Sequence, residues 1–313
     1  VIPVSGSLCD PSPSPTGLIS TPPSPSFSNA KLPVYLSPVF SLVYVPLPLP
    51  VSAFHVPSIS PLSSSNENFP SPLGTLFSST GGSIINNVIE VDSDKNMDRT
   101  KHRVLPTKKI SVKFALFLGL SFIVLGLSVL YLKVNTLTAL LSMLTIALYL
   151  LVYTPLKRVS WINTSIGAIP GAIPPLGGWT AATNSLDLGG IALFLILFFW
   201  QHPHFYAIAF MYRDDYAKAG LKMLPVVDNG IKRTVLHIFL HALILIPIST
   251  LPFFFGVSGR VYFVGAYLLS NIYMLCCLPF ILEQSRENAS LIFKTSIYYF
   301  PLLFFLILAD LFI

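Results

Sequence analysis

Seven apolar runs, each close to the length of a membrane-spanning helix, occupy the chain from residue 113 to its end. They cover residues 113–132, 136–154, 164–182, 188–211, 234–255, 261–282 and 292–312. An α-helix needs about 20 apolar residues to cross about 30 Å of hydrocarbon. The runs therefore predict an all-α, polytopic transmembrane helical bundle. The third run is rich in glycine and proline, so we expect it to be kinked or packed closely against its neighbours.

Composition agrees with a membrane protein and argues against a soluble enzyme. Hydrophobic residues make up 53% of the chain and charged residues 10%, whereas about 25% of residues are charged in an average soluble protein. A soluble domain cannot hide so many apolar side chains, because most of its surface faces water. The three cysteines (Cys9, Cys276 and Cys277) do not have the spacing of a disulfide framework or a metal site.

Residues 1–83 differ in character from residues 84–313. They contain 16 of the 27 prolines, and repeated proline prevents helix propagation because it removes a backbone donor and clashes with the preceding turn. We therefore expect residues 1–83 to be disordered, or foreign to the protein, and residues 84–313 to form the transmembrane domain.

Lysine and arginine indicate the orientation of the bundle. If every run spans the membrane, the segments 84–113, 155–163, 212–233 and 283–294 lie on one side, and they carry 16 of the 19 basic residues. Such an imbalance assigns that side to the cytoplasm or the mitochondrial matrix. Nine of the 13 acidic residues lie in the same segments. This face is therefore suited to a polyanion bridged by a divalent metal ion.

The first acidic group surrounds Asn86, Glu90 and Asp94, which would share one face of a helix. Carboxylate and amide oxygens are ligands that Mg²⁺ accepts. A solvated helix of mixed charge at the membrane edge is the simpler interpretation of the same spacing. The basic residues that follow would also suit a lipid-facing patch. These are Arg99, Lys101, Arg103, Lys108 and Lys109.

The second group begins where the fourth run ends, with the string WQHPHF at residues 200–205. Histidines at membrane depth are costly, so a functional role is the first expectation for His202 and His204. The alternative is a pair of interfacial histidines bonded to neighbouring helices. Asp214 and Asp215 follow a short distance further along the chain.

Four strings, in this order, resemble the protohaem IX farnesyltransferases (haem O synthases) of the UbiA-type intramembrane prenyltransferase family. They are Asn86-Asn87 with Asp94 and the following MDRTKHRVLP (97–106), YTPLKR (153–158), GAIPGAIPPLGGW (167–179) and WQHPHF (200–205). The resemblance extends from about residue 84 to the end of the chain. It implies a bundle of nine spans around a cavity, of which about seven are present here.

The resemblance also implies the reaction and the partners. Farnesyl diphosphate and haem B would be the substrates, Mg²⁺ the cofactor and haem O the product, with membrane lipid and a haem A synthase as further partners. We expect no nucleic-acid partner. The Pro/Ser-rich beginning resembles a misjoined exon, which favours the mitochondrial inner membrane over a bacterial one.

The resemblance assigns roles to particular residues. The metal ligands would be Asn86, Asn87, Glu90, Asp94, Asp214 and Asp215, and all but Asn86 are also expected to act in catalysis. The diphosphate would bind Arg99, Lys101, Arg103, Lys157 and Arg213, and the haem would bind His202 and His204. The arginine and lysine side chains would stabilise the negative charge that builds on the leaving diphosphate.

Two features depart from the family pattern. Glu90 stands where the family has Asp, and the Pro/Ser-rich segment stands where its first spans should be. We therefore expect the first motif to lack the support of a packed helix. The alternatives are a related membrane prenyltransferase with another aromatic or tetrapyrrole acceptor, a transporter or haem carrier, and an inactive truncated form.

Overall fold

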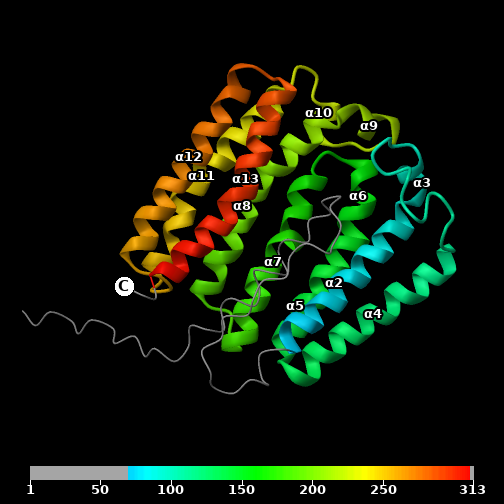
Figure 1. Ribbon diagram of the computed structural model, residues 1–313, viewed down its shortest axis with the longest axis horizontal. Helices are drawn as coiled ribbons and strands as arrows, with labels where there is room; N and C mark the ends of the chain where they lie inside the picture. Colours follow the sequence, from blue (N-terminus) through cyan, green and yellow to red (C-terminus); the bar gives the residue numbers. More distant parts are fainter. Residues whose placement is uncertain (1–69, 311–313) are drawn as a thin grey trace, which may run out of the picture. The chain divides into compact units, whose positions relative to one another are not determined.

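A computed structural model of the chain describes residues 70–310, which all lie within one compact unit (Figure 1). The expectation for residues 1–69 lies outside the described residues. Every regular element in the described part is a helix. The all-α prediction is therefore confirmed for this part of the chain.

Long helices form the bundle, and short helices lie in its connections. The long ones are α2 (Pro70–Ile89), α4 (Val112–Lys133), α5 (Thr136–Ala147) continuing through the π-helix η2 (Leu148–Tyr153) into α6 (Thr154–Val159), α7 (Asn163–Thr183), α8 (Leu188–Met211), α11 (Lys232–Phe254), α12 (Arg260–Leu282) and α13 (Arg286–Ala309). The short ones are α3 (Val91–Lys95), α9 (Arg213–Lys218) and α10 (Leu224–Val227).

Each of the seven apolar runs forms a long helix, as predicted. Six of these are long and apolar enough to cross a membrane. The exception is α7, which contains Pro170, Pro174 and Pro175 and is less apolar. Large apolar side chains on the outside of the bundle, such as Phe117 and Leu132 of α4, are 69% and 71% exposed. Such a surface is stable in lipid and not in water, so this is an integral membrane protein.

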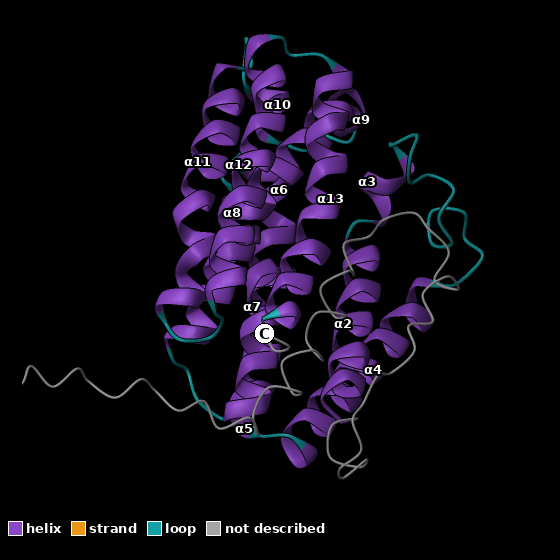
Figure 2. Cartoon of the chain, turned by 60° about the vertical axis from the view of Figure 1, so that its left-hand side comes forward, coloured by secondary structure: helices purple, strands orange, loops and turns teal. Residues whose placement is uncertain are grey.

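The first described helix, α2, includes residues 70–83, which we expected to be disordered or foreign to a transmembrane domain that begins at residue 84. It packs along α4 (Figure 2), and glycines lie where the two helices meet. A Cβ added to Gly126 would collide with the backbone of Ser78, and one added to Gly81 would lie 2.6 Å from the carbonyl oxygen of Gly119. Glycine lets the two backbones approach to this degree. The first motif is thus carried by a packed helix, contrary to our expectation.

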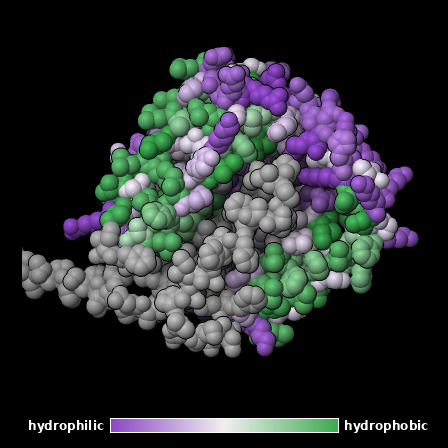
Figure 3. All heavy atoms as spheres, in the orientation of Figure 1, coloured by the Kyte–Doolittle hydropathy of each residue, from purple (hydrophilic) through white to green (hydrophobic). Residues whose placement is uncertain are grey.

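The helices alternate in direction, so the connections divide between the two ends of the bundle (Figure 1). The connections 90–111, 160–162, 212–231 and 283–285 lie at one end, which we call the charged end. Figure 3 shows hydrophilic side chains along this end and mainly hydrophobic ones on the sides. The arrangement is the one that the distribution of lysine and arginine predicted.

Helix α8 has the most buried position among the six membrane-spanning helices. In its most apolar stretch 56% of the residues are buried, against 22–33% in the other five. It packs against α7, α11 and α13, so the string WQHPHF lies in the interior of the bundle.

Candidate active site

The first acidic group lies at the charged end, where α2 ends and α3 begins. Asn86 is buried; its Nδ2 donates to Glu90 Oε2 at 2.8 Å, and its Oδ1 accepts from Thr154 Oγ1 at 2.9 Å. Glu90 is the N-cap residue of α3, and its Oε1 lies 2.8 Å from Lys157 Nζ. The expected helical face of Asn86 and Glu90 is therefore present, and α6 adds a cation and a hydroxyl to it.

Asp94 is paired with a cation in the same region. It is 2% exposed, and its Oδ2 accepts from Arg103 Nη1 at 3.0 Å. The same Nη1 donates to Asn87 Oδ1 at 3.2 Å. Burial raises the pKa of Asp94 above its ordinary value, and the nearby charge of Arg103 opposes this only in part. A further cation at this carboxylate would favour its ionised form.

We call these six residues the first cluster: Asn86, Asn87, Glu90, Asp94, Arg103 and Lys157. It contains two carboxylates, two amides and two cations, drawn from α2, α3, α6 and the connection that follows α3. A diphosphate could accept from the two cations while the carboxylates hold a metal ion against it.

The donor set of the first cluster fits Mg²⁺ and does not form a complete site by itself. Within residues 70–310, no three His, Cys, Asp or Glu side chains converge on one metal position. Mg²⁺ is commonly held by one or two carboxylates, with substrate phosphates and water completing its shell. Glu90 and Asp94 meet that requirement. The amide oxygens of Asn86 and Asn87 already accept from Thr154 and Arg103.

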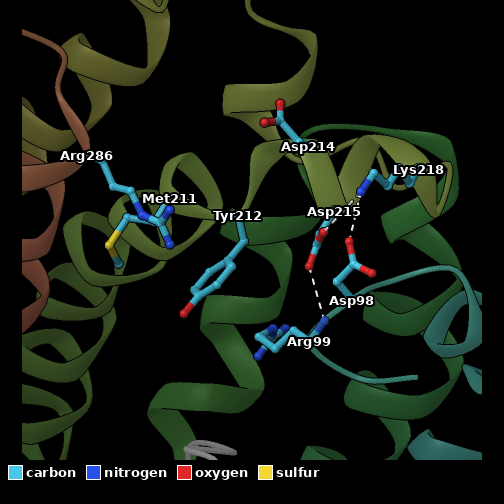
Figure 4. Close-up of a pocket in the computed structure, with 8 residues that line it drawn as sticks. All are labelled: Asp98, Arg99, Met211, Tyr212, Asp214, Asp215, Lys218 and Arg286. Atoms are coloured by element: carbon cyan, nitrogen blue, oxygen red, sulfur yellow. Dashed lines mark hydrogen bonds and ion pairs between the residues drawn. The ribbon is translucent and has the colours of Figure 1, made fainter. Parts of the chain in front are cut away.

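The second acidic group lies on α9, at the edge of a pocket of about 440 Å³ (Figure 4). Asp215 Oδ2 accepts from the backbone N–H of Arg99 at 3.3 Å. Lys218 Nζ lies 2.9 Å from Asp98 Oδ2 and 3.9 Å from Asp215 Oδ1. These contacts fasten the connection between α3 and α4 to α9.

Asp214 does not share a site with Asp215. Its side chain is 90% exposed and points away from that of Asp215 (Figure 4). The cation beside it is Arg213, whose Nε lies 3.8 Å from its carboxylate. The two aspartates therefore do not converge on one metal position.

The five predicted diphosphate-binding cations are divided between two places. Lys157 and Arg103 belong to the first cluster. Lys101 is bonded to Asp98, and Arg213 lies beside Asp214. The guanidinium group of Arg99 lines the pocket.

The two predicted haem-binding histidines point to different helices. His204 Nδ1 lies 2.7 Å from Ser296 Oγ of α13. The ring of His202 stacks on that of His241 of α11, with centroids 3.9 Å apart. Residues two apart on a helix face different sides, so one ligand cannot contact both in this arrangement.

His204, like His202, has one buried ring nitrogen without a hydrogen-bond partner in the described part of the chain. The Ser296 hydroxyl donates to the carbonyl oxygen of Phe293 at 2.6 Å, so it accepts from Nδ1 of His204. That bond leaves the lone pair on Nε2, which is buried without a hydrogen-bond partner in the described part of the chain. A histidine held in this tautomer is a suitable metal ligand.

Comparison with known proteins identifies the family. The sequence profile of the UbiA prenyltransferase family matches residues 62–307. The chain belongs to the UbiA prenyltransferase family. The match begins before residue 84, so it includes the first described part of α2.

Bacterial members of the UbiA family are similar over most of the sequence. A protein named protoheme IX farnesyltransferase from Solibacter usitatus is 42% identical over 238 residues, which is 76% of this chain and 82% of the relative. One of the same name from Aquifex aeolicus is 38% identical over 72% of this chain and 77% of its own.

Solved structures share the fold. A digeranylgeranylglyceryl phosphate synthase has a TM-score of 0.68 at 16% identity, covering 90% of this chain and 94% of its own. A UbiA homologue from Archaeoglobus fulgidus bound to DMAPP and Mg²⁺ has a TM-score of 0.60 at 17% identity, covering 89% and 96%. These likenesses show the UbiA fold alone.

Several residues of this family member contact the site without having been singled out from the sequence. Thr154 and Arg158 lie within the string YTPLKR; Thr154 bonds to Asn86, and Arg158 Nη2 donates to Ser93 Oγ at 2.8 Å. Their place in that string was the available signal. Tyr212 and Arg286 also line the pocket. Tyr212 directly precedes Arg213 in the second acidic group, whereas Arg286 lies in none of the motifs singled out from the sequence.

Proposed function

We propose that this UbiA family member transfers the farnesyl group of farnesyl diphosphate to a vinyl group of haem B, which forms haem O. The observation that carries the proposal is the first cluster, in which two largely buried carboxylates are each paired with a cation at the charged end. The relatives named protoheme IX farnesyltransferase support the choice of substrates.

The reaction breaks the bond between C1 of the farnesyl group and the diphosphate oxygen. A vinyl carbon of haem bonds to C1, water adds to the resulting cation, and one proton is released. The atoms balance without a protein nucleophile. The protein must stabilise the departing diphosphate and keep other water from the farnesyl cation.

Lys157 and Arg103 are placed to stabilise the departing diphosphate. The ammonium group has three donors and the guanidinium group five, so neither exhausts its donors on Glu90, Asp94 and Asn87. Donors fixed before the reaction stabilise developing negative charge effectively, because they need little rearrangement.

We assign Mg²⁺ to Glu90 and Asp94, with Asn86 and Asn87 beside them. When bound, the ion would neutralise diphosphate charge and so favour departure of the leaving group. The UbiA homologue bound to DMAPP and Mg²⁺ supports a metal requirement in the family. Asp215 receives a positioning role, since it accepts from the backbone of Arg99, and Asp214 receives none.

We assign His204 to the haem iron, because its Nε2 is free and its Nδ1 is fixed by Ser296. His202 shares these features, since its Nδ1 lies 2.7 Å from the carbonyl oxygen of Phe198 and its Nε2 also lacks a partner. It is the less suitable of the two because its ring stacks on His241 with centroids 3.9 Å apart, closer than the 5.2 Å between His204 and Trp200. The charged end would face the cytoplasm or the mitochondrial matrix. The mitochondrial inner membrane and the transfer of haem O to a haem A synthase stay predictions from the sequence; the relatives described above are bacterial.

The test is the haem content of cells that lack their own haem O synthase and express this chain. We expect haem O with the unaltered chain and none with Asp94→Ala. Asp92→Ala is the matched control, because Asp92 lies on the same short helix, is exposed and pairs with Lys95. Membranes that contain the unaltered protein and only haem B would refute the proposal.

A further inference from the structure

Two arginine side chains line the pocket at the charged end on either side of one aromatic ring (Figure 4). The guanidinium carbon of Arg99 lies 5.3 Å from the ring centroid of Tyr212, and that of Arg286 lies 6.0 Å from it. No carboxylate of the described residues forms an ion pair with either guanidinium group. Both therefore keep donors for an anion.

The acidic residues of the pocket are already compensated by other groups. Hydrogen bonds from Lys101 and Lys218 lower the pKa of Asp98 to about 2. Asp215 accepts from the backbone of Arg99 and lies near Lys218. Asp214 also lines the pocket, and Arg213 Nε lies 3.8 Å from its carboxylate. The charge that stays uncompensated in the pocket is therefore the positive charge of the two arginines.

The pocket lies nearer the charged end than His204 does, along both α8 and α13. On α8, Met211 lines the pocket and is seven residues beyond His204, which is two turns of the same face and about 10 Å. On α13, Arg286 precedes Ser296, the partner of His204, along the same helix. A flat molecule centred near His204 would therefore place one edge in the pocket.

We infer that this pocket binds the two propionate carboxylates of the haem substrate, with Arg286 and Arg99 as the donors. Arginine binds carboxylates through paired N–H donors, which fixes their orientation as well as their position. The vinyl groups occupy the opposite side of the porphyrin from the propionates. Propionates held at the charged end would therefore direct the vinyl groups away from the pocket. The inference rests on the proposed function and names a subsite within it.

The test measures haem binding by the purified full-length chain in lipid nanodiscs, from the change in the Soret band. Protohaem is compared with its dimethyl ester, in which both propionates are uncharged. We expect the unaltered chain to bind protohaem more tightly than the ester. Arg286→Gln should weaken protohaem binding about three- to tenfold, because Arg286 is exposed and solvent would partly screen its ion pair with a propionate. It should leave binding of the ester unchanged.

Two further variants make the comparison specific. Arg286→Lys keeps the charge and should retain part of the preference for protohaem. Arg260→Gln removes an arginine from the start of α12, at the opposite end of the bundle, and should have no effect. Inorganic pyrophosphate is titrated in parallel, and Arg286→Gln should not change its affinity.

The outcomes separate the inference from the proposed function. The inference is overturned if a chain that forms haem O binds protohaem and its ester equally, or if Arg286→Gln leaves its affinity for protohaem unchanged. The proposed function would stand in either case. Weaker pyrophosphate binding by Arg286→Gln also overturns the inference, because the pocket would then hold the diphosphate. Absence of both haem binding and haem O formation in the unaltered chain refutes the function itself.

Discussion

Lys157 Nζ lies 2.8 Å from Glu90 Oε1 and joins two residues that are 67 positions apart in the sequence. The two side chains are 13% and 14% exposed. A largely buried ion pair contributes little net stability when complete, and it is costly when one partner is missing. The pair is therefore best explained as a means of holding a cation and a carboxylate at a fixed separation.

Removal of the ammonium group should affect the reaction strongly. Lys157→Met is expected to lower haem O formation about a hundredfold, because one fixed donor to the leaving diphosphate is lost. The measurement is turnover in membranes at matched protein content. Lys222→Met is the control, since Lys222 is an exposed lysine at the same end. Equal turnover by both variants would contradict the assigned role.

Contact between α2 and α4 should be sensitive to single methyl groups. Gly126→Ala is expected to lower the free energy of unfolding by about 1–3 kcal/mol, because the added carbon collides with the backbone of Ser78. Gly177→Ala, also within a helix, would meet no atom within 4 Å. Thermal unfolding of the purified proteins compares the two, and equal midpoints would show that the close contact is absent.

The fastening of the α3–α4 connection should loosen in acid. Ion pairs hold the pKa of Asp98 at about 2, below its ordinary 3.8. Because the folded form favours the ionised carboxylate, the stabilisation is present above pH 3.8 and is lost as the pH falls toward 2. Pepsin cleavage within residues 96–111 should rise over this interval. Asp98→Asn should show high cleavage throughout, and an unaltered pH profile in that variant would contradict the assignment.

Ser296 should support haem binding without touching the haem. Ser296→Ala removes the acceptor that fixes Nδ1 of His204, and we expect haem affinity to fall about tenfold. The Soret titration described above measures it. Thr295→Ala is the control, because the neighbouring Thr295 hydroxyl bonds to its own helix at Leu291. A loss of equal size in the control would indicate a general effect on α13.

The length of the apolar runs was sufficient to predict seven helices, but it did not predict α2. That helix is rich in Ser and Gly, so it lacks the apolar signal, and its Pro70 and Pro72 suggested irregular structure. Both prolines lie in the first turn, where a missing N–H costs nothing. Its stability comes from contact with α4 through glycine, which sequence periodicity does not register.

The candidate site was predictable where its members are close in sequence. The spacing of Asn86 and Glu90 predicted their contact, and in the structure Asn86 Nδ2 lies 2.8 Å from Glu90 Oε2. Their pairing with Lys157 depends on how α6 packs, and spacing does not contain that information. The same limit explains Arg286, whose significance arises from its place across Tyr212 from Arg99.

The bond from Arg99 to Asp215 uses a main-chain amide, which every residue except proline possesses. The guanidinium group adds a second contact with α9, because its Nη2 donates to the Tyr216 hydroxyl at 3.4 Å. Exchange of the side chain removes that contact and leaves the main-chain bond. Arg99→Gln removes the charge and keeps the main-chain donor, whereas Arg99→Pro removes both, so the difference between the two variants measures the attachment alone. A lineage that acquired a different acceptor molecule would be free to replace this side chain while keeping the same loop in place.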